Sequence, residues 1–370
     1  MSKAQKNKDF IRFYDFRKDR EKYPDAWCYA IVGGRNTGKT YSTLKCYADD
    51  EDPIIFTKRT NKDIDSLCSG NRLGQKEKKY KIDLSPYKAI NRDTGRHLRA
   101  YKIMDGLGAF YEVPDGGEPV GVPFSYLASL HAVNDIKGFD LTECEACVFD
   151  EFIPQPWSRI DRKEGEQLME LYKTVSRARV LQGRGELKLI LLANAVNIWN
   201  PTLEVLGLID QVAEMSIKKI ETWYDPVRKI FIRILETPEE MMEAEHGTGM
   251  YETMKDTEWG HMAYDNEFGY NDFSRVRKVP LKGFRPRCKV IYKQKTYFIY
   301  QNENGSWYMC KAPSNAKGLK EYNLKEEMHQ RLFWYDYVID LINDAMEGRA
   351  YFETYSMYDI IVNYKKRFQL

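Results

Sequence analysis

One glycine-rich segment has the residue types and spacing of a phosphate-binding loop. The run Gly33-Gly-Arg-Asn-Thr-Gly-Lys-Thr40 matches GxxxxGK[ST], a pattern in which backbone N–H groups wrap phosphate oxygens. Its lysine places a positive charge on the β and γ phosphates, and the following hydroxyl binds Mg²⁺. We therefore expect ATP and Mg²⁺ as cofactors at this loop. The expected nucleotide contacts are Gly33, Gly34, Arg35, Asn36, Thr37, Gly38, Lys39 and Thr40.

A second segment supplies the acidic groups that nucleotide hydrolysis needs. The apolar run at 146–149 ends in Asp150 and Glu151. We expect Asp150 to hold Mg²⁺ together with Thr40, and Glu151 to polarise the attacking water as the general base. A glutamate placed for water favours hydrolysis over phosphoryl transfer to another substrate. The alternative is that Asp150 and Glu151 are a solvated strand end without a catalytic role.

A third apolar run, at 189–193, ends in Asn194. The Asn194 amide would hydrogen-bond the γ-phosphate or the attacking water, and would thereby report hydrolysis to the rest of the protein. Asparagine is also a common turn residue at the end of a strand, so a purely structural role of Asn194 is the alternative.

Apolar runs of strand length alternate with segments of helical spacing, and this alternation must position the three segments. It predicts an α/β fold with a mainly parallel sheet. The region 101–124 is instead typical of hairpins, with Asp115-Gly-Gly as a turn. The expected strands are 27–32, 53–57, 146–149 and 187–192, and the expected helices are 40–48 and a segment around 168–175.

The 370 residues exceed what one core usually organises, and we expect three parts. They are a P-loop ATPase domain at 1–225 with a basic N-terminal arm at 3–22, a linker or small helical subdomain at 226–280, and an α+β tail at 281–370. Seven scattered cysteines fit a reducing compartment. The longest apolar stretch, 189–198, is too short and polar to cross a bilayer, so we expect no membrane partner.

Together these segments resemble the genome-packaging ATPases of tailed bacteriophages, the family of large terminase subunits. The likeness is greatest to the phi-twenty-nine-type packaging motor of small protein-primed phages. It rests on the glycine-rich loop, on Val148-Phe-Asp-Glu-Phe-Ile153, on Thr174-Val-Ser-Arg177, and on Ala193-Asn-Ala-Val-Asn197 with Asn200-Pro201 close behind. Order and spacing match over residues 25–205, and the tail matches more loosely.

The resemblance implies an additional-strand P-loop ATPase joined to a small RNase H-like tail domain. Its subunits would form a homo-oligomeric ring, a pentamer in the phi-twenty-nine type. That ring would sit transiently on the portal protein of the capsid, in the cytoplasm of the bacterial host, and drive double-stranded DNA inward. Arg177 matches the arginine finger and Arg35 a common loop arginine, while Lys137 takes a basic position at a subunit edge or on DNA. The implied catalytic residues are Lys39, Glu151, Arg177 and Asn194.

Many large terminases also cut DNA, but the tail lacks the acidic clustering that a two-metal nuclease needs. The stretch 288–295 has no carboxylate, and Asp336, Asp340 and Asp344 recur every four residues as on a solvated helix face. We therefore expect no nuclease activity and a tail used for docking.

Basic residues gather near the start of the tail. They would bind the backbone of DNA, or of a packaging RNA as a further candidate partner, because such binding needs charge and no base readout. Ordinary surface cations are the alternative. Lys58 and Arg59, after the second strand, would line either the nucleotide site or a DNA channel. The cluster comprises Lys282, Arg285, Arg287, Lys289, Lys293 and Lys295.

The favoured function is ATP-driven translocation of double-stranded viral DNA into a preformed capsid. Other classes stay open: another DNA-stimulated P-loop enzyme such as a helicase, a small-molecule kinase, a terminase with nuclease activity, or a nucleotide-gated module that does no work.

Overall fold

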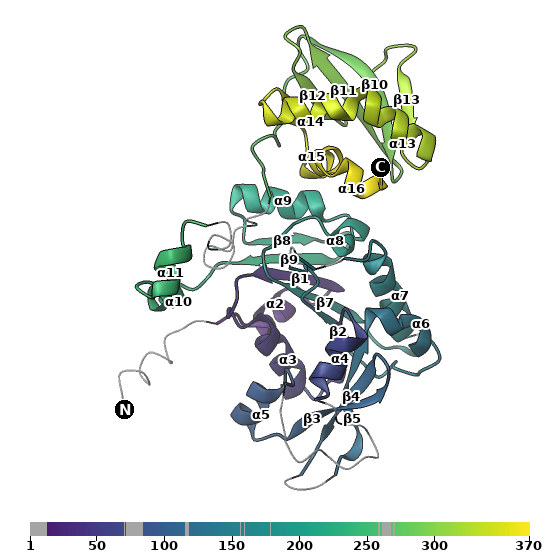
Figure 1. The fold of residues 1–370 in the computed structure, drawn as a ribbon. Helices are drawn as coiled ribbons and strands as arrows, with labels where there is room; N and C mark the ends of the chain where they lie inside the picture. Colours follow the sequence, from purple (N-terminus) through teal and green to yellow (C-terminus); the bar gives the residue numbers. More distant parts are fainter. Residues whose placement is uncertain are drawn as a thin grey trace. The chain divides into compact units, whose positions relative to one another are not determined.

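A computed structural model of the chain describes residues 13–69, 71, 84–114, 118–155, 157–158, 160–177, 179–257, 260, 268 and 271–370. The described residues form two compact units (Figure 1). The first comprises residues up to Leu206 and Lys218–Tyr270, and the second comprises Gly207–Ile217 and Asn271–Leu370.

The first unit contains a nine-stranded sheet in the order β3-β4-β5-β2-β6-β7-β1-β9-β8. The six neighbouring strands β5, β2, β6, β7, β1 and β9 are parallel to one another. Antiparallel strands extend the sheet at both edges. Strand β7 lies between β1 and β6, which is the additional-strand arrangement, so the predicted fold class is confirmed. The strands are β1 (Cys28–Gly33), β2 (Ile54–Lys58), β3 (Leu98–Met104), β4 (Leu107–Glu112), β5 (Val120–Ser129), β6 (Ala146–Asp150), β7 (Lys188–Ala193), β8 (Thr222–Asp225) and β9 (Ile230–Leu235).

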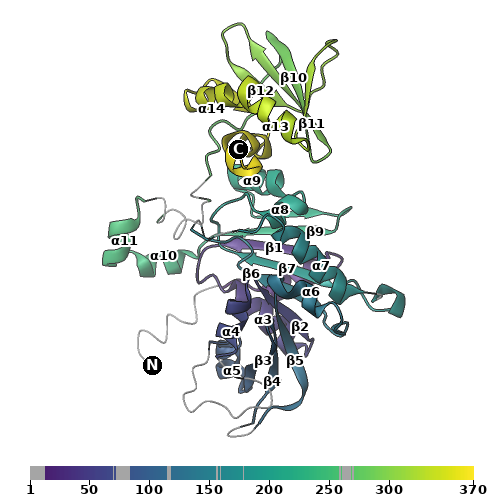
Figure 2. The ribbon, with the colours of Figure 1, turned by 45° about the vertical axis from the view of Figure 1, so that its right-hand side comes forward.

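Helices cover both faces of this sheet, as Figures 1 and 2 show. Because β1, β6 and β7 are covered on both sides, nearly all of their residues are buried, which explains their uninterrupted apolar sequences. The helices are α2 (Phe16–Lys22), α3 (Lys39–Asp49), α4 (Asn61–Leu67), α5 (Lys88–Thr94), α6 (Val133–Ile136), α7 (Glu164–Ser176), α8 (Pro201–Val205), α10 (Glu239–Glu245) and α11 (Gly249–Met254), with short 3₁₀ turns η1 (Leu130–Ala132) and η2 (Val180–Gln182).

The N-terminal segment differs from the predicted arm. Its residues 1–12 lie outside the described part, but Phe16–Lys22 forms helix α2, which packs on α3. Phe16 is fully buried against the Tyr29 ring, and Arg17 and Arg20 both form ion pairs with Asp50, the residue that follows α3. Arg17 and Arg20 therefore fix α2 to the first unit. The predicted turn at Asp115-Gly-Gly also lies outside the described residues.

The boundaries of the units differ from the sequence-based ones as well. The expected end of the first domain at 225 misses β9, which pairs with β1 along its whole length. The segment 226–280 thus contributes a core strand in addition to α10 and α11. The second unit begins at Asn271, and it also takes in residues 207–217, most of helix α9 (Ile209–Lys218).

The second unit is a five-stranded sheet with helices, the α+β tail that was predicted. Its strand order is β13-β10-β11-β12-β14, with β10, β11 and β12 antiparallel and both edge strands parallel to their neighbours. A continuous helical segment, α13 to α14, contains one π-helical turn, η3. The elements are β10 (Phe284–Tyr292), β11 (Lys295–Asn302), β12 (Trp307–Cys310), β13 (Lys320–Asn323), α13 (Glu327–Phe333), η3 (Trp334–Val338), α14 (Ile339–Met346), β14 (Ala350–Phe352), α15 (Tyr355–Val362) and α16 (Tyr364–Phe368).

No helix in the described ranges is long and apolar enough to cross a bilayer. All seven cysteines are buried as free thiols, including the Cys144 and Cys147 pair.

Candidate nucleotide site

The glycine-rich loop joins β1 to α3, with its backbone turned by two left-handed residues, Asn36 (φ 62°) and Gly38 (φ 87°). A side chain at Gly38 would be strained at this φ, and its Cβ would approach the Phe13 Cβ to 3.3 Å. The Thr37 hydroxyl donates to the Gly34 carbonyl over 3.1 Å and closes the loop. Arg35 and Asn36 are exposed on its outer side.

Lys39 is folded into this loop and is only 8 % exposed. Its ammonium donates to the carbonyls of Gly33 (3.0 Å) and Gly34 (2.5 Å), and to Asn194 Oδ1 (3.4 Å). Burial lowers the Lys39 pKa to about 8, partly opposed by the charge of Asp150. Neutral oxygens thus surround a buried cation, and phosphate oxygens in their place would raise that pKa again. The lysine environment therefore fits a nucleotide phosphate.

Asp150, at the end of β6, meets Thr40 at the start of α3. The Thr40 hydroxyl donates to Asp150 Oδ1 over 3.1 Å. A hydroxyl and a carboxylate side by side are oxygen ligands of the kind that Mg²⁺ prefers, so these two residues fit the metal of a bound nucleotide.

Lys58, from the end of β2, joins the same group. Its Nζ lies 2.8 Å from Asp150 Oδ2 and 3.4 Å from Glu151 Oε2, and its side chain is 15 % exposed. Burial alone would lower the Lys58 pKa, but the two carboxylates outweigh it and raise the pKa above its ordinary value. Of the two places that the sequence left open for Lys58, these contacts favour the nucleotide site.

Glu151 stands on a left-handed turn (φ 61°), and its side chain is 66 % exposed. Arg59 holds this turn, since its Nη2 donates to the carbonyls of Glu151 (3.0 Å) and Phe152 (3.3 Å). The guanidinium also forms an ion pair with Glu164, the first residue of α7. Arg59 is therefore a structural clamp beside Glu151, and its place on nucleic acid stays a prediction. Glu164 was missed by sequence reasoning, since 105 positions separate it from Arg59.

Arg177 and Lys137 lie together, but at the other end of α7. Arg177 follows the last residue of the helix, and its Nη2 donates to the Lys137 carbonyl over 2.5 Å. Lys137 Nζ lies 3.4 Å from Glu170 on the same helix. The 13 residues of α7 span about 20 Å, and Glu164 at their start adjoins the Glu151 turn. Arg177 is therefore remote from the nucleotide site of its own chain.

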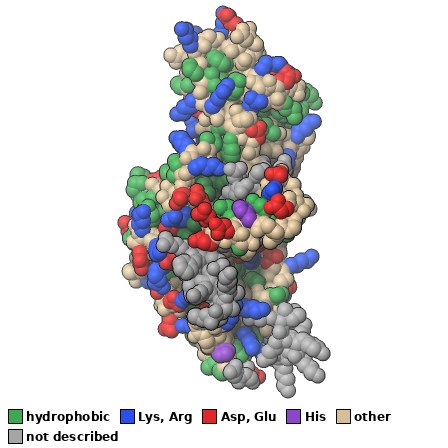
Figure 3. Space-filling model, turned by 90° about the vertical axis from the view of Figure 1, so that its left-hand side faces the viewer, with side chains coloured by type: hydrophobic (Ala, Val, Ile, Leu, Met, Phe, Trp, Pro, Cys, Tyr) green, Lys and Arg blue, Asp and Glu red, His purple; other side chains and the backbone are tan. Residues whose placement is uncertain are grey.

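The basic cluster of the tail does not form one patch. On the face drawn in Figure 3, Lys and Arg side chains are scattered over the second unit. Arg285 lies 3.1 Å from Glu303 and Lys289 lies 2.7 Å from Glu321, while Lys293 and Lys295 lie at the opposite end of β10 from Arg285. Lys282 is exposed just before the strand.

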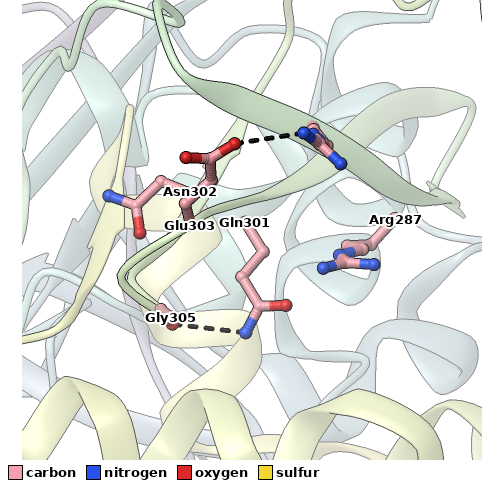
Figure 4. A pocket seen from close by; sticks show the side chains of 6 residues that line it. Arg287, Gln301, Asn302, Glu303 and Gly305 are labelled. Carbon is pink, nitrogen blue, oxygen red and sulfur yellow. Dashed lines mark hydrogen bonds and ion pairs between the residues drawn. The ribbon is translucent and has the colours of Figure 1, made fainter.

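Arg285 and Arg287 line a shallow cavity of about 330 Å³ at the turn between β11 and β12. In Figure 4 the Arg287 and Gln301 side chains reach toward it from neighbouring strands. Gln301 also donates to the Gly305 carbonyl over 3.2 Å.

Two of the three later acids of the tail form hydrogen bonds to the sheet, whereas Asp340 is exposed. Asp336 accepts hydrogen bonds from the Lys320 ammonium and from the Tyr322 hydroxyl, and each donor–acceptor distance is 2.5 Å. Asp344 accepts from the Trp307 indole N–H over 2.8 Å. Both carboxylates thus tie helices to the sheet. Among the described residues, no group of three or more His, Cys, Asp or Glu side chains could hold a metal ion.

A phosphate-binding loop after β1, an acidic end of β6 and an amide-bearing strand β7 between them define the class of additional-strand P-loop ATPases. Residues 125–356 match the model of the family described as podovirus DNA encapsidation protein (Gp16), and the chain belongs to that family. Its function is accordingly ATP-driven packaging of viral DNA.

Two solved structures are similar over nearly the whole chain. The Phi-28 gp11 DNA packaging motor has 17% identity and a TM-score of 0.60, covering 97% of this chain and 98% of its own. The bacteriophage Phi-29 viral genome packaging motor assembly has 17% identity and a TM-score of 0.61, covering 96% of this chain and 99% of its own. At this identity they support the fold. No curated protein matches the sequence.

Proposed function

We propose that this chain is the ATPase subunit of a ring-forming motor that drives double-stranded DNA into a preformed capsid. The observation that carries the proposal is the meeting of Lys39, Thr40, Asp150 and Asn194 within hydrogen-bonding distance at one edge of the parallel sheet, with Glu151 beside them. Mg²⁺-ATP would supply the phosphoanhydride that is split.

Each side chain then has one task. Lys39 binds the β and γ phosphates, and Thr40 and Asp150 hold the metal. Glu151 accepts the proton of the attacking water; its exposed position on a fixed turn leaves room for that water. Asn194 already contacts the Lys39 ammonium, so its amide is placed to respond when a phosphate arrives or leaves.

Arg177 would complete the site of a neighbouring subunit. Its position about 20 Å along α7 from Glu164 supports action in trans, because the chain's own phosphates are out of reach. Such an arginine finger stabilises transition-state charge and makes each hydrolysis depend on the next subunit. Lys137, joined to it through a hydrogen bond, would act at the same edge.

The tail would dock the motor on the portal protein and on nucleic acid, without cutting DNA. The involvement of Asp336 and Asp344 in structural hydrogen bonds supports this part, since neither is left to build a metal site. By resemblance the ring would be a pentamer working at the portal in the bacterial cytoplasm, with a packaging RNA as a further partner.

The decisive experiment combines the purified chain with procapsids, duplex DNA and ATP, and measures both phosphate release and DNA protected from added nuclease. Wild-type protein should hydrolyse ATP faster with duplex DNA and should protect it. Glu151→Gln should do neither while still binding ATP. Strand separation of the duplex, or protection that persists in Glu151→Gln, would contradict the proposal.

A further inference from the structure

The segment that precedes α2 contacts the phosphate-binding loop. The Tyr14 backbone N–H donates to the Thr37 carbonyl over 3.0 Å. Phe13 lies beside Gly38, because a Cβ at that glycine would come within 3.3 Å of the Phe13 Cβ. We call residues 13–16 the strap. Nothing in the sequence indicated that the strap reaches the loop.

Polar contacts anchor the strap to the first unit. The Tyr14 hydroxyl donates to Asp19 over 2.9 Å, and Asp19 also accepts two hydrogen bonds of 2.6 Å from the Arg233 guanidinium. Asp19 is 2 % exposed, and its charge is tolerated there because these partners satisfy it. Burial and the Asp19 charge raise the Tyr14 pKa, so the hydroxyl keeps the proton that it donates. The Phe16 N–H donates to the Ser42 hydroxyl over 2.7 Å and thereby fixes the strap to α3 as well.

Strand β9 supports both the strap and the start of the loop. Arg233, which holds Asp19, and Leu235 are two positions apart, so they lie on one face of the strand. Leu235 pairs with Gly33, the last residue of β1, and a Cβ at Gly33 would come within 2.6 Å of the Leu235 Cβ. The loop is therefore supported at Gly33 by β9 and at Thr37 by the strap.

The Tyr14 hydrogen bond fixes the peptide group between Thr37 and Gly38. In a planar trans peptide the C=O and the N–H point in opposite directions, so a donor that holds the Thr37 carbonyl also sets the direction of the Gly38 N–H. Backbone N–H groups of such a loop are the donors that wrap phosphate oxygens. The loop needs support from outside, because Asn36 has a left-handed conformation (φ 62°) that is uncommon for residues other than glycine.

We propose that Tyr14 is a positioning residue for the nucleotide, since its N–H holds the Thr37 carbonyl and thereby directs the Gly38 N–H toward the phosphates. The inference deepens the proposed function, on which it rests. Tyr14 acts through the loop and takes no part in bond cleavage. The loop wraps phosphates that ADP and ATP share, so loss of the hydrogen bond weakens the binding of both nucleotides equally. Such uniform binding changes KM and leaves kcat as it is.

The first test removes the Tyr14 N–H alone. An amide-to-ester replacement at this position, introduced with the α-hydroxy acid analogue of tyrosine, keeps the side chain and deletes the donor. The dissociation constants for Mg²⁺-ADP and for a non-hydrolysable ATP analogue should both rise by roughly threefold to tenfold, which corresponds to one hydrogen bond. KM for ATP should rise by the same factor, with kcat unchanged.

Ser42→Ala is the matched control, because it removes the hydrogen bond of the strap to α3 and leaves the one to the loop. Its dissociation constant for Mg²⁺-ADP should stay within about twofold of wild type. Thermal unfolding measures what each bond contributes to stability. An ester variant that unfolds at a lower temperature but binds ADP as wild type does would make the bond merely structural and overturn the proposal. An equal loss of affinity in Ser42→Ala would overturn it as well.

The second test uses the wild-type protein. If the hydrogen bond favours nucleotide binding, the nucleotide must favour the hydrogen bond by the same factor. Hydrogen exchange of the Tyr14 N–H, resolved to single residues by mass spectrometry, should therefore slow by roughly threefold to tenfold when Mg²⁺-ADP is added. ADP binding with unchanged Tyr14 exchange would refute this inference alone. Wild-type protein that binds no ADP would refute the proposed function together with the inference.

Discussion

Arg59 and Glu164 form an ion pair that links the end of β2 to the start of α7, and the same guanidinium holds the backbone of the turn at Glu151. The side chains are 15 % and 1 % exposed. Two residues 105 positions apart thus fix the backbone of Glu151, the proposed general base.

We expect Arg59→Met to destabilise the first unit by about 3–5 kcal/mol, because it leaves the Glu164 charge buried without a partner. Arg59→Met with Glu164→Leu should recover most of that stability. Turnover should stay low in both, since the carbonyls of Glu151 and Phe152 lose their donor. Thermal unfolding and phosphate release measure the two effects, and wild-type turnover in the double variant would contradict the clamp.

Lys39→Ala and Glu151→Gln should separate binding from hydrolysis. Loss of the Lys39 ammonium removes a contact to ground-state phosphates, so affinity for a fluorescent ATP analogue should fall strongly. Glu151→Gln should keep that affinity and lose multiple-turnover hydrolysis, because only proton acceptance is removed. Hydrolysis at the wild-type rate would exclude Glu151 as the base.

Lys58→Met distinguishes the two places considered for Lys58. Its contacts with Asp150 and Glu151 predict altered ATP hydrolysis and altered Mg²⁺ dependence of nucleotide binding. Affinity for duplex DNA and its salt dependence should be unchanged in the presence of a non-hydrolysable analogue. A shallower salt slope with normal hydrolysis would return Lys58 to the DNA channel.

Mixing variants tests whether Arg177 acts on a neighbour. Arg177→Ala subunits should be inactive alone, and so should Lys39→Ala subunits. Together they should regain hydrolysis, since one supplies an intact nucleotide site and the other an intact arginine, and such an arginine is worth about 10³–10⁵ in rate. The bland alternative is that Arg177 only stabilises the end of α7 by about 0.3–1 kcal/mol. If the two variants assemble together but hydrolysis does not recover, Arg177 does not act on a neighbour and only stabilises the helix end.

The tail should bind nucleic acid without cleaving it. Reversing Arg287, Lys293 and Lys295, all exposed, should reduce the slope of log affinity against log salt by roughly 0.9 for each DNA phosphate that the protein no longer neutralises. Full-length protein with Mg²⁺ or Mn²⁺ should leave plasmid DNA intact. Metal-dependent nicking would reveal a nuclease, and an unchanged slope would place nucleic acid elsewhere.

The central strands could be predicted because burial on both faces leaves them apolar throughout. The tail hairpin could not be predicted, because the chain reverses at Lys293 and Gln294. These two residues adopt positive φ (46° and 64°) without the Asn or Gly that usually marks such a turn. Tertiary pairing of β10 with β11 overrides the local preference.

Within the candidate site, the meeting of Lys39, Thr40, Asp150 and Asn194 was predictable from one short motif and two strand ends. The partners that fix them were not, because a single sequence does not show which distant residues meet. Arg177 and Arg179 illustrate the limit: they are two positions apart, yet one is exposed and the other is 1 % exposed beneath a loop. Their difference arises from the chain reversal after α7.

Residues 207–217 belong to the second unit, although the chain returns to the first before entering the tail at Asn271. The backbone therefore passes between the units three times. Three peptide connections, and not a single tether, therefore join the two units. One of these connections leaves the ATPase core only 13 residues after Asn194. In the proposed motor, this short covalent path would carry a change at the nucleotide site to the second unit.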